Sequence, residues 1–173
     1  MTHRFLATLA ALAALAPALA SAQPTPPPPP EPTLEFVFEE VIGLGAAISP
    51  GKTAIGDRNI VPITGGTFEG PGLKGTIMPG AWDWQLRRPD GCTELKADYF
   101  LKTDDGVVIN VVNKGALCPA ATGQPANRST QPVLEAPIGK YDWLSKSTLI
   151  STIALAKAPD GGVAVRIRFY RVR

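Results

Sequence analysis

The stretch from Thr93 to Leu117, TELKADYFLKTDDGVVINVVNKGAL, contains two alternating segments separated by a turn. In the first segment the odd positions are largely apolar and the even positions largely charged, a period of two that is typical of a half-buried strand. In the turn, two aspartates precede Gly106, which suits the left-handed position of a three-residue hairpin loop with a glycine bulge. The stretch therefore predicts an antiparallel hairpin in which Thr103 pairs with Val107.

The chain has two cysteines, and the register of this hairpin relates them. Continued to the far end of the hairpin, the register places Cys92 directly opposite Cys118. Cysteines of an exported chain tend to pair, because such chains fold in an oxidising compartment. We therefore expect a disulfide between Cys92 and Cys118. The alternative is two free thiols in a reducing compartment, which the N-terminal segment described below disfavours.

The same register assigns the two faces of the hairpin. Its inward set is largely apolar and includes Leu95, Tyr99, Val111 and Asn113, whereas its outward set carries most of the charges. A charged outer face argues against an outer-membrane barrel, whose outer belt has to be apolar. We therefore expect a soluble domain that does not insert into a membrane.

Alternation interrupted by Gly, Pro and Asp-Gly continues along the chain, with two more glycine-bulge turns at RRPDGC and APDGG. The pattern predicts eight strands, at 34–44, 59–69, 72–79, 81–88, 93–103, 107–116, 145–156 and 163–172. Eight strands in hairpin order predict an all-β fold, a single antiparallel barrel with up-and-down connectivity. The proline-rich segment 117–144 is the longest irregular piece and is interpreted as a lid or a binding loop.

Glycines are frequent in the stretch 60–86, IVPITGGTFEGPGLKGTIMPGAWDWQL. We assign them to the fold: Gly65 and Gly66 to a bend or bulge inside a strand, and the others to tight turns. The nearby GAAISPGKT is similar to a phosphate-binding loop, but five residues separate its glycines where the motif has four, and no helix follows. The chain therefore lacks a nucleotide-binding loop.

The N-terminus predicts export. Residues 1–22 combine Arg4, an apolar run and the small residues Ala20-Ser21-Ala22, which is typical of a signal peptide cleaved after Ala22. Residues 23–33, QPTPPPPPEPT, form a proline-rich leader that favours an extended spacer. The β-barrel domain then spans 34–173, and we expect a periplasmic or secreted protein.

Charge and composition exclude several kinds of chemistry. With 17 basic and 15 acidic residues the chain is nearly balanced, which gives no case for a nucleic-acid partner. The single histidine, His3, lies in the predicted signal peptide, so histidine-dependent nucleophiles and the usual histidine-bearing zinc sites are excluded from the exported chain. We expect no metal and no cofactor, and the oligomeric state is left open.

The barrel interior supplies the candidate site. Carried back to strand 81–88, the register points Asp83 and Gln85 inward beside Ala97 and Leu95, and points Trp82 and Trp84 outward. A bulge near Trp82 would exchange the two faces. If Asp83 points inward, the lumen combines apolar walls with four polar groups, which suits a small-molecule pocket: Asp83, Gln85, Tyr99 and Asn113. The alternative is a buried hydrogen-bond network that holds no ligand.

Four motifs show a family resemblance. VPITGGTFEGPGLKG, PGAWDWQL, TDDGVVINVVNKG and APIGKYDWL occur in this order in the family called domain of unknown function 3237. The chain resembles that family over roughly residues 34–173. The resemblance implies a compact antiparallel barrel of about eight strands, and it implies no particular activity.

Three functions remain open on these residues. The first is a protein that binds a small, partly apolar ligand in the lumen, with Arg128 and Trp143 contributing from segment 117–144. The second is an enzyme without metal or cofactor that transfers a proton, such as an isomerase, cyclase or lyase. In such an enzyme Asp83 or Glu69 would act as the acid or base, and Tyr99 would donate to a developing oxyanion. The third is a structural module of the cell envelope.

Overall fold

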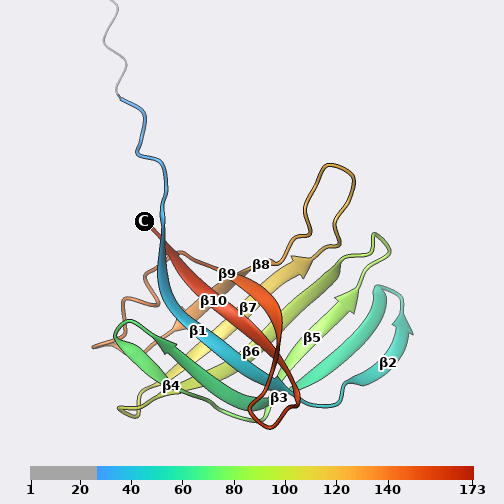
Figure 1. The fold of residues 1–173 in the computed structure, drawn as a ribbon, viewed down its shortest axis with the longest axis horizontal. Coiled ribbons are helices and arrows are strands. Elements are labelled where there is room, and N and C mark those ends of the chain that lie inside the picture. Colours follow the sequence, from blue (N-terminus) through green and yellow to red (C-terminus); the bar gives the residue numbers. More distant parts are fainter. Residues whose placement is uncertain (1–26) are drawn as a thin grey trace, which may run out of the picture. The chain divides into compact units, whose positions relative to one another are not determined.

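The computed structural model describes residues 27–173, so the predicted signal peptide lies outside the described residues. Residues 27–33 contain no strand. From residue 34 onward every regular element in the described part is a strand (Figure 1). The ten strands are β1 (Leu34–Leu44), β2 (Ile48–Thr53), β3 (Gly56–Gly70), β4 (Leu73–Ile77), β5 (Ala81–Arg87), β6 (Thr93–Thr103), β7 (Val108–Leu117), β8 (Ser129–Glu135), β9 (Leu149–Lys157) and β10 (Val163–Val172).

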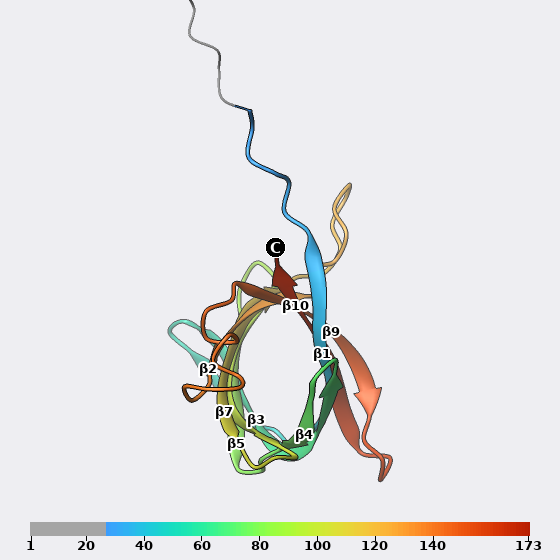
Figure 2. The same ribbon diagram turned by 90° about the vertical axis from the view of Figure 1, so that its left-hand side faces the viewer.

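The strands form a closed antiparallel barrel of eight strand positions with up-and-down connectivity, as the sequence predicted (Figure 2). From β5 to β10 each strand pairs with the next one along the chain, and β10 pairs with β1. The long strand β3 completes the ring. One of its edges pairs with β2 and then with β1, and its other edge pairs with β5 and then with β4. Ten strands therefore fill eight positions.

Two strands were missed in the sequence. β2 is short and largely exposed, and β8 lies within the segment 117–144 that was interpreted as a loop. Pro132 in β8 pairs with Asn113 of β7, but only Ser129 and Thr130 of β8 pair with β9. A proline has no amide hydrogen to donate, so it suits a strand that is bonded mainly along one side.

The hairpin registers agree with the prediction. Thr93 pairs with Leu117, and the Thr103 amide donates to the Val107 carbonyl at 2.9 Å. Gly91, Gly106 and Gly161 all have positive φ, as the glycine-bulge turns require. Cys92 and Cys118 form a disulfide.

The bend in β3 at Gly65 and Gly66 brings β1 very close. A Cβ atom at Gly66, where φ is +153°, would lie 2.1 Å from the carbonyl oxygen of Val41 and 3.1 Å from the Cα atom of Ile42. Only glycine fits such an approach. The glycine pair thus shapes the wall of the barrel, as the sequence interpretation proposed.

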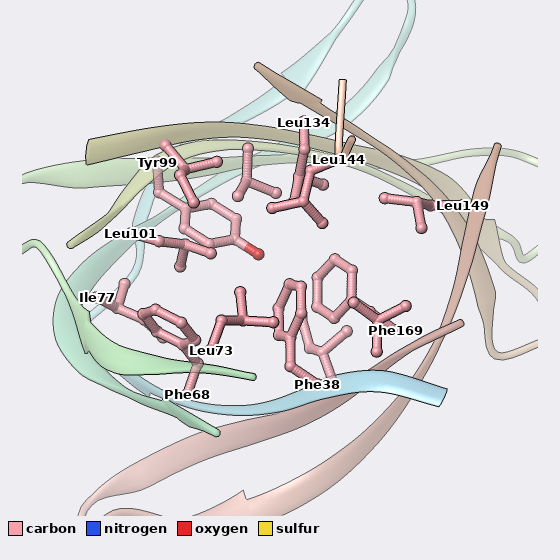
Figure 3. Packing of buried hydrophobic residues seen from close by; sticks show 14 of the residues in the cluster. Phe38, Phe68, Leu73, Ile77, Tyr99, Leu101, Leu134, Leu144, Leu149 and Phe169 are labelled. Carbon is pink, nitrogen blue, oxygen red and sulfur yellow. The ribbon is translucent and has the colours of Figure 1, made fainter. Parts of the chain in front are cut away.

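One end of the barrel is filled. At this end residues 136–148 connect β8 to β9 and bury Tyr141 and Leu144, which belong to the same hydrophobic core as Phe38 and Phe169 (Figure 3 labels Leu144 and both phenylalanines). The rings of Phe38 and Phe169 stack with their centroids 4.3 Å apart. Asp105 anchors this segment, because its carboxylate accepts hydrogen bonds from Lys140 Nζ at 2.8 Å and from the Tyr141 hydroxyl at 3.1 Å. We call this the closed end.

The first and last strands also meet at the closed end. The Thr33 amide donates to the Arg173 carbonyl at 3.1 Å, and the Arg173 amide donates back to the Thr33 carbonyl at 2.9 Å. The opposite end carries the turns 88–92 and 158–162 and the loop 118–128, and we call it the mouth. No stretch of the described residues forms a helix with the length and apolar character needed to cross a bilayer.

Candidate functional site

A cavity of about 220 Å³ occupies the half of the barrel interior next to the mouth. Most of its wall is apolar and comes from strands on all sides of the barrel, including Ile42 of β1, Leu95 of β6 and Ile153 of β9. Five polar residues also line it: Asp83, Gln85, Asn113, Arg128 and Thr130. The cavity has the composition of a small-molecule site, in which apolar walls surround a few polar groups.

Asp83 points into this cavity from β5. The register pairs it with Ala97 of β6, and its neighbours Trp82 and Trp84 lie on the outer surface with 40% and 46% of their area exposed. No bulge exchanges the faces here, so the inward orientation expected from the hairpin register holds. The side chain that the sequence singled out at the end of the glycine-rich stretch therefore faces the lumen.

The Asp83 carboxylate is only half satisfied. Its Oδ2 atom accepts a hydrogen bond from Gln85 Nε2 at 2.7 Å, whereas its Oδ1 atom is buried and has no hydrogen-bond partner. Burial raises the pKa of Asp83, and the hydrogen bond from Gln85 opposes this rise in part. A buried carboxylate with one free oxygen is available to bind or exchange a proton with a ligand.

Asn113 and Thr130 extend the polar side of the cavity across β7 and β8. The Asn113 side chain is 3% exposed, and its Oδ1 atom has no partner within the described residues. The Thr130 hydroxyl is instead occupied by a short hydrogen bond with the Ser151 hydroxyl of β9. Asn113 is therefore free to hydrogen-bond a ligand, while Thr130 joins two strands.

Arg128 stands at the mouth, directly before β8. Its backbone carbonyl accepts a hydrogen bond from the Ile153 amide at 2.9 Å, which connects the loop to β9. Its exposed side chain lines the cavity and forms no ion pair among residues 27–173. A guanidinium at this position can attract an anionic group of a ligand.

Tyr99 lies below the cavity and not on its wall. It is fully buried, and its hydroxyl donates a hydrogen bond to Glu40 Oε2 at 2.7 Å. On the two strands, Tyr99 and Glu40 are the inward residues next to Ala97 and Ile42, which do line the cavity. Burial raises the pKa of Tyr99, and the negative charges of Glu40 and Asp83 raise it further.

Glu40 is the buried acid that the sequence interpretation did not single out. It is 0% exposed, and its Oε1 atom has no partner. Burial raises its pKa from 4.5 to about 8, against the opposing hydrogen bond from Tyr99. One signal could have found it, because Phe38 and Ile42 flank it at intervals of two in β1 and alternation therefore places Glu40 on the apolar face.

Two other predicted residues lie away from the cavity. Glu69 is exposed on the outer face of β3, where it pairs across the strands with Glu39 and Lys74. Trp143 belongs to the closed end, and the Arg171 guanidinium lies over its ring at 4.8 Å from the centroid. The segment 117–144 thus sends Arg128 to the mouth and Trp143 to the opposite end.

A metal site would need clustered ligands, and the two cysteines of the described part of the chain are already joined in the disulfide. Among residues 27–173, no three His, Cys, Asp or Glu side chains gather closely enough to hold a metal ion. Three polar residues of the cavity, Asp83, Asn113 and Arg128, have side-chain atoms available to a ligand, and the buried Glu40–Tyr99 pair lies next to the cavity.

Comparison with known proteins places this barrel in a family. The sequence profile described as "Protein of unknown function (DUF3237)" matches residues 32–172. A UPF0311 protein of Rhodopseudomonas palustris is 34% identical over 137 residues, which cover 71% of this chain and 90% of that protein. A β-barrel-like protein of Acinetobacter baumannii has a solved structure that superposes with a TM-score of 0.73 and 31% identity, covering 84% of this chain and 99% of that one.

One relative carries an enzyme name. The protein called hydroalkoxylation enzyme, from Penicillium herquei, is 28% identical over 121 residues, which cover 70% of this chain and 74% of that protein. The structure of an enzyme from Penicillium herquei has the same fold, with a TM-score of 0.67 at 22% identity over 86% of this chain and 100% of that one. Because the family profile spans nearly the whole barrel domain and relatives share a third of its residues, the chain belongs to the DUF3237 family.

Proposed function

We propose that the protein binds a small, largely apolar molecule in its barrel cavity and that Asp83 transfers a proton to or from it. One observation carries this proposal: Asp83 lines a largely apolar cavity at the mouth of the barrel, and one of its carboxylate oxygens is buried without a hydrogen-bond partner. Burying a carboxylate in this way costs free energy that a purely structural role does not recover. Perturbed carboxylates in clefts are typical of acid–base sites.

The environment of Asp83 suits general acid–base chemistry. Desolvation makes the carboxylate a stronger base, and a raised pKa brings its proton exchange closer to neutral pH. Gln85 holds one oxygen in place by its hydrogen bond, which leaves the other oxygen without a partner in the protein and able to exchange a proton with a ligand. Asn113 and Arg128 would hold the polar atoms of the ligand, and the apolar walls would hold its carbon skeleton.

The name of the Penicillium herquei relative suggests a reaction that fits these groups. Hydroalkoxylation adds the O–H bond of an alcohol across a carbon–carbon double bond. In the proposed step the protonated Asp83 gives its proton to one alkene carbon, and the π electron pair forms that C–H bond while the hydroxyl oxygen bonds to the other carbon. The Asp83 carboxylate then takes the hydroxyl proton and is restored to its protonated form. The C–O and C–H bonds replace the O–H and π bonds, so no oxidant, reductant or cofactor is consumed.

The proposed location is outside the cytoplasm. The Cys92–Cys118 disulfide closes the β6–β7 hairpin at the mouth, and disulfides persist mainly in oxidising compartments. The apolar run and small-residue pattern of residues 1–22 support the same location.

The proposal is tested with 2-allylphenol, which holds a hydroxyl group and a double bond in one small molecule and cyclises to a product of equal mass. Binding is followed by thermal shift and conversion by chromatography. We expect Asp83→Asn to retain binding and to lose conversion by roughly 10²-fold or more. The matched control is Asp98→Asn, which removes an exposed carboxylate from the outer face of β6.

Each outcome has a separate meaning. Equal conversion by the wild type and Asp83→Asn refutes the acid–base role of Asp83. Binding without conversion, across a panel of unsaturated phenols and alcohols, leaves the protein as a binding protein, the function that the apolar walls support without chemistry. If no member of the panel shifts the melting temperature, the cavity is not a ligand site.

A further inference from the structure

The polar residues that line the cavity lie at different depths, and the strand register separates them. The deep row, which runs across β5 to β8, consists of Asp83, Ala97, Asn113 and Pro132. The next row toward the mouth consists of Gln85, Leu95, Gly115 and Thr130. Arg128 lies two residues beyond Thr130 and also lines the cavity. Because Arg128 and Pro132 are four residues apart, about 13 Å of extended chain separates Arg128 from the deep row.

The cavity thus has one charged residue at each end. Among residues 27–173, Asp83 is the single acid that lines it and Arg128 is the single cation. The two side chains do not form an ion pair with each other. The wall between them is largely apolar and includes Leu95, Leu117 and Ile153. The entrance of the cavity therefore presents a positive charge that no acid of the described chain neutralises.

Hydrogen bonds fix the backbone on both sides of Arg128. Before it, the Asn127 amide donates to the Cys118 carbonyl at 3.0 Å, and the Cys118 amide donates to the Asn127 carbonyl at 3.2 Å. After it, the Ser129 amide donates to the Asn127 side-chain oxygen at 3.1 Å. The Arg128 carbonyl itself accepts from the Ile153 amide. The guanidinium is therefore carried by an ordered stretch at the base of the loop 118–128.

We propose that the cavity selects ligands with one negative charge, a carboxylate, which Arg128 binds at the mouth while the reacting hydroxyl group and double bond lie at Asp83. A guanidinium binds a carboxylate through two parallel hydrogen bonds, so arginine suits this recognition. A single cation matches one negative charge and would leave a doubly charged phosphate only half neutralised. The inference rests on the function proposed for the cavity, because it names the class of substrate for the same site.

The distance between the two charged residues determines how the groups of the ligand are arranged. The hydroxyl group and the double bond have to reach the deep row, whereas the carboxylate has to stay at the exposed end beside Arg128. A carboxylate in that position remains in contact with water and avoids the large cost of burying a charge between apolar walls. The substrate class is therefore an unsaturated hydroxy acid in which an apolar skeleton separates the carboxylate from the reacting groups.

The test compares two molecules that differ in one charge. The first is 3-allyl-4-hydroxybenzoate, which is 2-allylphenol with a carboxylate on the ring carbon opposite the hydroxyl group, and the second is its methyl ester. Calorimetric titration gives their dissociation constants, and chromatography follows conversion. We expect the wild type to bind the carboxylate at least about tenfold more tightly than the ester. Added salt should reduce this preference, because the Arg128 side chain is exposed.

Three variants assign the preference to Arg128. Arg128→Gln should bind both molecules with the affinity that the wild type has for the ester. Arg128→Lys keeps the charge but loses the paired hydrogen bonds, so it should keep part of the preference. The matched control is Arg87→Gln, which removes an exposed guanidinium at the end of β5 that does not line the cavity. This control should keep the whole preference.

The outcomes for this inference and for the proposed function are distinct. A wild type that binds the carboxylate no more tightly than the ester overturns the inference, and so does a preference that Arg128→Gln leaves intact. An equal loss of affinity for both molecules in Arg128→Gln overturns it too, because such a loss would indicate a structural role. Conversion without a preference refutes only this inference, whereas a preference without conversion refutes only the acid–base role of Asp83.

Discussion

Replacing Glu40 by glutamine is expected to abolish most of the loss of stability that the protein suffers between pH 5 and pH 8. In the unfolded chain the Glu40 carboxyl ionises near pH 4.5, whereas in the folded barrel burial keeps it protonated up to about pH 8. Between these values the unfolded state releases a proton that the folded state retains. The free energy of unfolding therefore falls as the pH rises through this window.

The magnitude follows from the pKa. Each unit of pKa difference corresponds to about 1.4 kcal/mol. The rise of the Glu40 pKa from 4.5 to about 8 then costs about 3 kcal/mol at pH 7 and about 5 kcal/mol above pH 8. Below about pH 4.5 both states are protonated, and the cost disappears. Glutamine stays neutral at every pH and still offers an oxygen to the Tyr99 hydroxyl.

The assay is urea unfolding at steps from pH 5 to pH 9 for the wild type, Glu40→Gln and a control, Glu69→Gln. The control makes the same substitution on the exposed face of β3. The stability of Glu40→Gln relative to the wild type should rise by several kcal/mol over this range, while that of the control stays constant. Subtracting the free energy of unfolding of the wild type from that of Glu40→Gln at each pH removes the contributions of other titrating groups, such as Asp83 and Asp105. A Glu40→Gln difference that does not change with pH would refute the argument, because it would mean that Glu40 is ionised or hydrated in the folded state.

Two further predictions concern the construction of the barrel. Gly66→Ala should lower the free energy of unfolding by roughly 3–5 kcal/mol, because its Cβ atom would overlap the Val41 carbonyl 2.1 Å away. Gly123→Ala shares the positive φ but meets no atom within 4 Å, so it should cost only about 1 kcal/mol; equal losses in urea unfolding would contradict the close approach. Replacing Cys92 and Cys118 by serine opens a bridge that spans 26 residues and should cost about 3.5 kcal/mol of stability. An unchanged unfolding midpoint for this double variant would show that the bridge does not constrain the unfolded chain.

The prediction of the β5–β6–β7 sheet depended on residues in its turns, which are close together in the sequence. Glycine-bulge turns determine which residues face each other, and this register located Asp83 in the lumen and Cys92 opposite Cys118. The same reasoning assigned Trp82 and Trp84 to the outside. Wherever a short turn joins two strands, the sequence contains the information that sets their register.

Long-range packing determined the features that were missed. The prolines of segment 117–144 concealed β8, which is a strand because β7 pairs with it and not because of its own propensity. The register showed that Tyr99 faces inward, but it contains no information on depth along the barrel axis, so it grouped Tyr99 with Asp83. Glu40 has no local motif, and its role depends on Tyr99, which lies 59 residues away in the chain.

The paired backbone bonds between Thr33 and Arg173 make the barrel nearly a continuous loop of chain. A short linker from residue 173 to residue 33 would close that loop, and a cut in the exposed turn 159–161 would create new ends without removing a strand. The order in which the strands are synthesised is then separable from the order in which they pair. Because both original ends lie on the side away from the mouth, a reporter domain or a surface attached at Arg173 leaves the entrance to the cavity accessible.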